Sequence, residues 1–411
     1  MGREILVLLM VMKIMKKHLK NFLIFILVIL IGTGVSSYYL GSDIFNIESV
    51  INFIDNEKST SALKIDDTKY NADGGFYYSS LNGKEKDVYD KIYSRAKNQN
   101  TTIKIHSDLG SDRILEIASF VENEHPELFW LTGAYTIDTS GILTLKSKYT
   151  SDEIANLSEQ IKSKTDSILQ NVNDGMSDYE KSLYFYEYIT KNVSYSDEAL
   201  DNSENMPWAS SLVGPFTMGR CTCLGYAKAY QYLLQLSKIN CAVVYGKAET
   251  PQGKSAHAWV IQECDGACYY TDPTWGDCFE QSGNEDYISH SYFCVDENEI
   301  EKTHTVENKD ILPKCTANAD NYFVKSKLLF SSYSRSDVKT AVKNSIESGN
   351  YYVELKYTSE NAYNEAVKKL FDEGQIYYIL TAASIKNKNI NFEKTKYSEN
   401  KALHIITIFF N

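Results

Sequence analysis

The sequence contains few residues of the kinds that interrupt regular structure, with 21 glycines and 6 prolines among 411 residues. This scarcity excludes collagen-like and low-complexity chains. Hydrophobic residues make up 43% of the chain and charged residues 23%. That balance is ordinary for globular proteins, and it excludes both a disordered chain and a polytopic membrane protein. At roughly 150 residues per domain, the length allows two or three folded units.

Basic residues are outnumbered by acidic ones, 42 to 54, and the chain carries a formal net charge of −12. Proteins that bind the phosphate backbone usually present an excess of positive charge, so nucleic acid is not an expected partner. The N-terminus differs, because residues 1–20 hold five basic side chains and one acidic side chain. A basic N-terminal segment before an acidic remainder indicates a targeting segment followed by a domain that is exposed to solvent.

A long stretch without charge follows the basic head. Residues 22–40 contain no charged side chain, and Phe22–Ile31 is continuously apolar. A helix of this length spans roughly 28 Å, about the thickness of a bilayer core. We expect residues 1–21 to be a basic cytoplasmic head and residues 22–40 to be a transmembrane anchor or a signal peptide.

Both readings of the N-terminus place the rest of the chain outside the cytoplasm. The protein is therefore expected to be membrane-anchored and extracellular, or secreted, with the membrane as a partner through the N-terminal segment. Residues 41–75 are polar and rich in Asn, Asp, Ser and Gly. This composition predicts a linker between the N-terminal segment and the folded part.

Eight cysteines are too few for a disulfide scaffold in a chain of this length. No pair is spaced as Cys-x-x-Cys, and no histidine lies at zinc-ligand spacing from them, so we expect no structural metal site. Cys264 and Cys268 flank an Asp-Gly turn and are a candidate disulfide, although nothing in the sequence requires one.

Hydrophobic periodicity indicates helices followed by strands in residues 76–325. The helical stretches are 84–97, 111–124, 152–172, 177–191 and 223–238, and the strand stretches are 241–247, 256–263 and 267–272. Ser111, Ser151 and Ser177 are expected to cap three of these helices.

The pattern changes after residue 325, and residues 326–411 are predicted to be a separate, small α/β domain. Helices are expected over 337–348 and 360–372. Strands are expected over 350–357, 376–382, 391–396 and 402–410.

Three residues with catalytic chemistry follow one another between Gly219 and Asp277. Cys223 stands at the start of an amphipathic helix, where the helix dipole and free N–H groups favour a thiolate. His257 begins a predicted strand, and Asp272 ends the next one. A histidine oriented by a carboxylate can serve a cysteine nucleophile as general base and acid.

The turn between the two strands decides whether His257 can meet Asp272. Asp265-Gly266 is a strong signal for a two-residue hairpin loop. In that register Trp259 faces Asp272, and His257 is a diagonal neighbour of Asp272, roughly 7 Å away at Cβ. A three-residue loop without a bulge would place them on opposite faces of the sheet, so we predict the two-residue register.

The motifs around these residues resemble the bacterial branch of the transglutaminase-like superfamily, a papain-like Cys-His-Asp group. The resemblance rests on Cys-x-Gly-Tyr-Ala at Cys223–Ala227, His-Ala-Trp at His257–Trp259 and Asp-Pro-Thr-Trp at Asp272–Trp275. The three motifs stand in the family's order, and the likeness covers residues 76–325. The chain departs from the family at Val260, where asparagine is common.

The resemblance implies an α+β fold with a papain-like transglutaminase core, in which the helix that bears the cysteine packs on an antiparallel sheet. It implies that Cys223 is the nucleophile, that His257 is the general base and acid, and that Asp272 orients His257. Cys221 is not the nucleophile in this alignment, because the family's cysteine lies two residues before the Gly-Tyr pair. No cofactor and no metal is expected to be needed.

The expected function is exported, thiol-dependent acyl transfer on protein or peptide amides. Two alternatives remain, a cysteine protease or amidase of the same fold and a catalytically inactive binding or structural module at the cell surface. The expected partner is a protein or peptide substrate, with the cell wall as a further candidate. We expect Trp259 and Trp275 to pack beside the site. For His304 a structural cap or surface role is favoured, and the alternative is a second histidine near the site.

Overall fold

The computed structural model describes residues 75–250, 253–277, 287–383 and 395–410. The predicted basic head and the predicted anchor or signal segment lie outside the described residues, as does the predicted linker up to residue 74. Within the described ranges, no helix is both long enough and apolar enough to cross a membrane.

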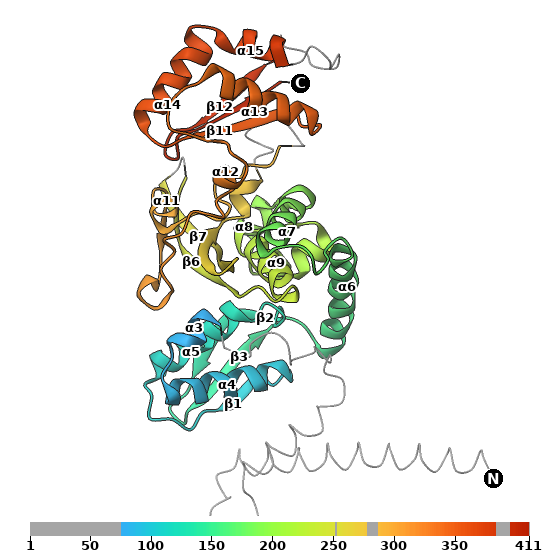
Figure 1. The fold of residues 1–411 in the computed structure, drawn as a ribbon. Coiled ribbons are helices and arrows are strands. Elements are labelled where there is room, and N and C mark those ends of the chain that lie inside the picture. Colours follow the sequence, from blue (N-terminus) through green and yellow to red (C-terminus); the bar gives the residue numbers. More distant parts are fainter. Residues whose placement is uncertain (1–74, 251–252, 278–286, 384–394, 411) are drawn as a thin grey trace, which may run out of the picture. The chain divides into compact units, whose positions relative to one another are not determined.

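The described chain begins with three helices and a small sheet (Figure 1). The sheet is antiparallel, with its strands in the order β1-β3-β2. Asn82 starts α4 with a capping box, because its side chain accepts the Glu85 N–H while the Glu85 carboxylate accepts the Asn82 N–H. The elements of this part are α3 (Phe76–Ser80), α4 (Gly83–Lys97), β1 (Thr102–Lys104), α5 (Ser111–Glu124), β2 (Leu131–Ile137) and β3 (Ile142–Ser147).

The central part contains the helix that bears Cys223 and a four-stranded sheet in the order β8-β7-β6-β9. Every neighbouring pair in this sheet is antiparallel. Helix α9 packs against β6 and β7 (Figure 1), so the cysteine helix lies on an antiparallel sheet as expected. The elements are α6 (Ser151–Leu169), α7 (Asp178–Asn192), β4 (Ser194–Tyr195), α8 (Asp197–Asp201), β5 (Arg220–Cys221), α9 (Cys223–Leu236), β6 (Cys241–Thr250), β7 (Gly253–Cys264), β8 (Ala267–Thr271), α11 (Glu297–Ile300) and β9 (His304–Val306).

The predicted register between β7 and β8 is confirmed. Cys264 pairs with Ala267, and Val260 pairs with Thr271, across a two-residue turn. The turn residues Asp265 and Gly266 both have positive φ, 45° and 87°. Positive φ at both central positions is what a tight hairpin of this hand requires.

The candidate disulfide between Cys264 and Cys268 is not formed, because both thiols are free. Cys264 shares a sheet face with its partner Ala267, and side chains alternate along a strand, so Cys268 points to the opposite face. The Cys264 thiol instead makes a hydrogen-bond contact with Cys294. Of the eight cysteines, Cys278 lies outside the described residues.

The expected helix caps are correct at Ser177 and displaced by one residue at the other two positions. Ser177 caps α7, and its hydroxyl accepts the Glu180 N–H. Helix α6 is capped by Thr150, which forms a capping box with Glu153 and makes Ser151 the first helical residue. Gly110 precedes α5, so Ser111 is likewise its first residue.

The first turn of α9 lies against the 3₁₀ turn η2 (Pro207–Ser210). Thr222, the N-cap of α9, donates its N–H to the Ala209 carbonyl at 2.9 Å. A Cβ atom on Gly225 would lie 2.4 Å from the same carbonyl oxygen and 2.5 Å from Cβ of Cys221. Glycine is therefore required at this position, and the close contact holds the tip of the helix in place.

The last part of the chain builds another four-stranded sheet, which has its own hydrophobic core. The strands run in the order β10-β11-β13-β12, with β10 parallel to β11 and the remaining pairs antiparallel. We call β10 to β13 the C-terminal sheet. Its elements are α12 (Tyr322–Lys325), which precedes it, β10 (Leu329–Phe330), α13 (Arg335–Glu347), β11 (Tyr352–Tyr357), α14 (Glu360–Val367), α15 (Gln375–Ala383), β12 (Lys396–Asn400) and β13 (Ile405–Phe409).

The prediction of a strand over 376–382 is wrong, because this stretch lies in helix α15. Its buried side chains are Ile376, Ile379 and Leu380, which recur at helical spacing. Tyr377 and Tyr378, of a residue type common in strands, are 60% and 65% exposed. The predicted strand over 391–396 falls mostly outside the described residues, and β12 begins at Lys396.

Candidate active site

Cys223 is the first residue of α9 and is half-buried. Its N–H has no acceptor within the helix, and the positive end of the helix dipole lies at its side chain. Cys221, two residues earlier, is fully buried. Burial raises the pKa of Cys221 well above its usual range, and the charges of Cys223 and Asp277 raise it further. The structure therefore leaves Cys223 as the accessible thiol of the pair.

His257 on β7 lies between Cys223 and Asp272. Its Nε2 is 2.9 Å from Oδ2 of Asp272, and its side chain also hydrogen-bonds with Cys223. Because Nε2 is engaged by the carboxylate, Nδ1 is the ring nitrogen left for the thiol. The side chain of His257 is only 8% exposed.

The carboxylate keeps His257 protonated. Burial lowers the pKa of His257, but the charge of Asp272 and hydrogen bonds with Asp272 and Cys223 outweigh that effect and raise the pKa to about 10. The ring is therefore cationic at neutral pH. A cation beside Cys223 favours the thiolate, which is the reactive form of the side chain.

Asp272 directly follows β8 and is fully buried. Its Oδ1 accepts the N–H groups of Thr274 at 2.9 Å and Trp275 at 3.4 Å, which leaves Oδ2 for His257. Burial raises the pKa of Asp272, but the charge of His257 and hydrogen bonds from His257 and His304 hold it well below the usual range. The Asp-Pro-Thr turn thus orients an ionised carboxylate toward the imidazole.

Two tryptophans pack beside His257, in line with the role expected for them. The ring centroids of Trp259 and Trp275 lie 6.0 and 5.8 Å from that of His257. Trp259 is fully buried, and its Nε1 has no hydrogen-bond partner among the described residues. Rings in these positions exclude water, which strengthens the electrostatic interaction between His257 and Asp272.

His304 is part of the site, which corrects the expected capping or surface role. It is 2% exposed, and its Nε2 lies 3.3 Å from Oδ2 of Asp272. It reaches that position because β9 pairs with β6, where His304 lies opposite Ala248. The sequence signal was weak. A lone Thr-His pair many residues after the last motif does not show which strand will pair with the segment that bears His304.

A groove of about 750 Å³ lies beside the start of helix α9. Its lining includes Leu224, directly after Cys223, together with Tyr245 of β6. Residues 131–135 of β2 also line it. Neither Cys223 nor His257 is among the residues that line this groove.

Two tyrosines near the thiol were missed by the sequence motifs. Burial raises the pKa of Tyr195, and the charge of Cys223 raises it further. Burial likewise raises the pKa of Tyr245, with Glu122 and Cys223 among the charges that add to the rise. Tyr195 comes from β4 and Tyr245 from β6, and only folding brings the two strands to the helix tip.

Three side chains of the site carry atoms of the kind that bind metals. His257, Asp272 and His304 place one such atom each within 4.8 Å of one another. Hydrogen bonds from the two imidazoles to one carboxylate oxygen already account for this cluster. The expectation that no metal or cofactor is needed stays a prediction.

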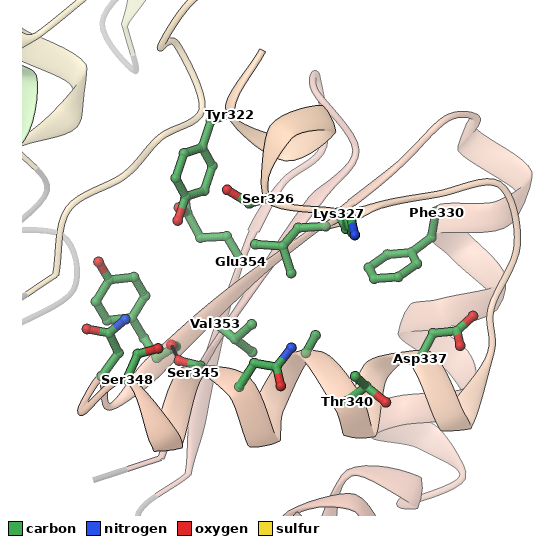
Figure 2. A pocket seen from close by; sticks show the side chains of 15 residues that line it. Tyr322, Ser326, Lys327, Phe330, Asp337, Thr340, Ser345, Ser348, Val353 and Glu354 are labelled. Carbon is green, nitrogen blue, oxygen red and sulfur yellow. Dashed lines mark hydrogen bonds between the residues drawn. The ribbon is translucent and has the colours of Figure 1, made fainter. Parts of the chain in front are cut away.

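A second cavity, of about 390 Å³, lies beside the C-terminal sheet. Figure 2 shows Thr340, Ser345 and Ser348 on one side of it and Tyr322 and Glu354 on the other. Its lining is rich in hydroxyl groups and contains no cysteine among the described residues. It therefore lacks a thiol nucleophile, and the side chains around Cys223 are the better candidate for catalysis.

Comparison with known proteins agrees with the motif analysis. Residues 166–275 match the model of the Transglutaminase-like superfamily, and this range contains Cys223, His257 and Asp272. No curated protein matches the sequence significantly.

Several solved structures are similar to part of this chain. They include a TGase, with 15% identity over 42% of this chain and 50% of that chain and a TM-score of 0.27. A candidate cysteine protease from Cytophaga hutchinsonii has 15% identity over 34% of this chain and 61% of that chain, with a TM-score of 0.24. Menin, solved to reveal its binding site for the Mixed Lineage Leukemia protein, has 16% identity over 73% of this chain and 55% of that chain, with a TM-score of 0.22. This chain thus spans about half the length of the TGase and of menin.

Proposed function

We propose that this chain, which carries a transglutaminase-like domain over residues 166–275, is a thiol-dependent acyl-transfer enzyme that acts on protein or peptide amides. Cys223 is the nucleophile, His257 is the general acid and base, and Asp272 orients His257. The observation that carries the proposal is the row of hydrogen bonds from Cys223 through His257 to Asp272. The thiol supplies the nucleophile and the imidazole supplies the proton, so the reaction needs no metal or cofactor.

The first half of the reaction forms a thioester. The Cys223 sulfur attacks the carbonyl carbon of the amide, and the bond from that carbon to nitrogen breaks. His257 gives its proton to the departing amine, and the acyl group stays on the sulfur. The Cys223 N–H at the helix tip is a suitable donor to the oxygen that becomes negative in the tetrahedral intermediate.

The second half of the reaction releases the acyl group. Water or a primary amine attacks the thioester carbon, passes a proton to His257 and displaces the Cys223 sulfur. Water gives hydrolysis, which is the activity of a protease or amidase, and an amine gives a crosslink. Mass spectrometry of peptides incubated with a labelled primary amine distinguishes the two outcomes, because only transfer adds the label.

We expect Cys223→Ala to abolish turnover while the protein stays folded, because the change removes the attacking sulfur and little else. Cys221→Ala is the matched control, since it removes a buried thiol two residues away. The measurement is turnover of peptide and protein amides by full-length wild type and both variants, with circular dichroism to verify folding. Equal turnover in wild type and Cys223→Ala would refute the assignment.

The alternative of a catalytically inactive module has a separate test. A thiol activated by His257 should react with iodoacetamide at neutral pH faster than the buried Cys221, because the thiolate is the reacting species. Fragmentation spectra of the peptide that contains both cysteines locate the label. A Cys223 that reacts no faster than Cys221 would favour the inactive module.

We also propose that the protein is exported, either anchored by residues 22–40 or secreted after their removal. The support is the charge pattern of the N-terminus, a basic head followed by an uncharged stretch. Protease treatment of intact cells that produce the full chain is the test. Residues 76–411 should be degraded from outside or found in the medium, and full protection would contradict export.

A further inference from the structure

Residues 287–295 run antiparallel beside β8, the strand that leads to Asp272. Because β8 is an edge strand of its sheet, this segment lies along its open side. Tyr270 and Val295 each donate a backbone N–H to the other's carbonyl at 2.9 Å. Asp272 donates its N–H to the Tyr292 carbonyl, also at 2.9 Å. We call residues 287–295 the flanking segment, and it holds the backbone at Asp272.

The flanking segment also holds the turn that follows Asp272. Ser289 donates its N–H to the Gly276 carbonyl at 3.0 Å, at the end of the 3₁₀ turn η4 (Thr274–Gly276). The Ser289 carbonyl accepts the hydroxyl of Tyr186 on α7 at 2.6 Å. A Cβ atom on Gly276 would lie 2.5 Å from that hydroxyl oxygen. The turn, α7 and the flanking segment are therefore in close contact, and a shift of the segment would displace the turn whose N–H groups bind Asp272.

One buried carboxylate of the C-terminal sheet anchors the flanking segment. Nδ1 of His290 lies 2.8 Å from Oε2 of Glu354 on β11, and the His290 backbone nitrogen lies 3.2 Å from both carboxylate oxygens. Tyr287 donates its hydroxyl to the same carboxylate at 3.2 Å. His290 and Glu354 are each 2% exposed. Because a buried carboxylate needs donors in place of water, Glu354 keeps the segment in contact with the sheet.

The ring of His290 also contacts a helix of the central part. Its Nε2 lies 3.1 Å from Oε1 of Glu187 on α7. Carboxylates accept hydrogen bonds and do not donate them, so Nδ1 and Nε2 both carry hydrogens when both contacts are made. The side chain of Glu187 is 44% exposed, and that of Glu354 is 1% exposed. Since water can replace His290 only at Glu187, the contact with Glu354 is the one that persists when His290 loses a proton.

We propose that His290 and Glu354 are positioning residues for Asp272, and that the C-terminal sheet takes part in the Cys223 site through this pair. The proposal rests on the function proposed above. The pair fixes the flanking segment, the segment fixes the backbone and the turn at Asp272, and Asp272 orients His257. Neither positioning residue touches the reacting atoms.

The readout is the rate at which iodoacetamide alkylates Cys223 in the full-length protein, measured from about pH 5 to about pH 11, a range that spans the ordinary pKa values of histidine and cysteine. In the described ranges, the titratable side chains that face His257 are Cys223 of α9, Asp272 after β8 and His304 of β9. The alkaline inflection of the rate reports the proton on His257, because the cationic ring favours the reactive thiolate. A carboxylate that moves away from the ring lets His257 lose this proton at lower pH.

His290→Phe removes both ring nitrogens and keeps a ring that can stack on Tyr322, as that of His290 does. We expect the inflection to move down by on the order of one pH unit, the effect of one weakened hydrogen bond to a charged group. Loss of a positive charge that acts through space would instead move the inflection up, because a nearby cation makes His257 release its proton more easily. An upward shift, or no shift in a folded variant, would overturn the proposal.

Glu354→Gln tests the same contact from the sheet with little change of shape, and it decides the question if His290→Phe does not fold. A neutral amide is a weaker acceptor than a carboxylate, so the inflection should again move down, by less than in His290→Phe. Glu187→Gln is the matched control, because it removes a negative charge beside the same ring and leaves the contact with Glu354 in place. Its inflection should not move. Equal shifts in the two glutamate variants would mean that charge acts through space, and they would overturn the proposal.

His125→Phe is the control for the loss of a buried histidine. His125 is 3% exposed, its Nδ1 lies 2.9 Å from Glu127, and its ring stacks on Tyr93 with centroids 3.7 Å apart. It lies outside the flanking segment, so the inflection should stay in place even where stability falls. A shift as large as that of His290→Phe would contradict the proposal. Because alkylation needs no substrate, the proposal can pass these tests when no amide is turned over, and that result would refute only the proposed function.

Discussion

Among single residues, Asp272 has the strongest electrostatic effect on the site. It is fully buried, yet four donors hold it ionised: the imidazoles of His257 and His304 and the N–H groups of Thr274 and Trp275. A buried carboxylate with this many donors stays charged because each hydrogen bond replaces part of the lost hydration. Its charge is the reason why a buried histidine remains a cation at neutral pH.

Removal of this charge should lower the pKa of His257. We expect Asp272→Asn to bring that pKa from about 10 toward its ordinary value near 6.5, because only Cys223 then opposes the effect of burial. His257 would be largely neutral at about pH 8, Cys223 would lose its neighbouring cation, and kcat should fall by about 10²–10⁴-fold. The measurement is kcat against pH, whose alkaline limb should move to lower pH.

Asp320→Asn is the control for this prediction. Asp320 is also buried, and its carboxylate accepts the hydroxyl of Tyr269 on β8 without contact to His257. The alkaline limb should stay in place in this variant. An unmoved limb in Asp272→Asn would contradict the assignment of Asp272 as the residue that sets the charge of His257.

At the scale of elements, the tip of α9 depends on a close contact with η2. The contact leaves no room for a side chain at residue 225, where a Cβ would lie 2.4 Å from a backbone oxygen. We expect Gly225→Ala to lower the free energy of unfolding by about 1–3 kcal/mol, the usual cost of overpacking, and to slow alkylation of Cys223 by moving the helix tip. Urea denaturation and iodoacetamide labelling measure the two effects.

Gly83→Ala is the matched control on a different helix. Gly83 is the first residue of α4, and a Cβ there would meet nothing within 4 Å. Alanine favours helix over glycine, so the stability of this variant should be unchanged or slightly higher. A Gly225→Ala protein as stable as Gly83→Ala would show that the α9 tip is not constrained by η2.

An element was predictable where neighbouring residues in the sequence specify its geometry. It was not predictable where the residue types and their spacing indicate different structures. The β7–β8 register followed from Asp265-Gly266, because a two-residue turn leaves one alignment of its flanking strands. Helix α15 was mistaken for a strand, and it contains Tyr377 and Tyr378, of a residue type that is common in β structure. The spacing of the apolar residues 376, 379 and 380 was the more reliable signal, since it reflects which side chains become buried.

At the scale of the whole molecule, a buried histidine joins the central part to the C-terminal sheet. Nδ1 of His290 lies 2.8 Å from Glu354 on β11, and Nε2 lies 3.1 Å from Glu187 on α7. The ring stacks on Tyr322 with centroids 3.8 Å apart. Burial lowers the pKa of His290, but hydrogen bonds to the two glutamates and their charges outweigh it and raise the pKa to about 9.

This raised pKa makes stability depend on pH in a defined direction. The contribution of His290 should be complete below about pH 6.5, the ordinary histidine pKa, and should be lost as the pH rises through about 9. Its full size is up to about 3 kcal/mol for a shift of this extent. Urea denaturation at about pH 6 and about pH 10 should show a larger loss of stability in wild type than in His290→Gln, and equal losses would contradict the prediction.

The sequence by itself determined the parts of the site that depend on neighbours along the chain. Cys223 at a helix tip and the meeting of His257 with Asp272 across a hairpin both follow from short-range periodicity and turn chemistry. Only the tertiary structure decided that His304, Tyr195 and Tyr245 join them. These residues lie on strands whose neighbours are chosen by packing between distant segments, such as β9 beside β6. No local pattern of side chains specifies which distant strands will meet, because that choice depends on how the whole core is filled.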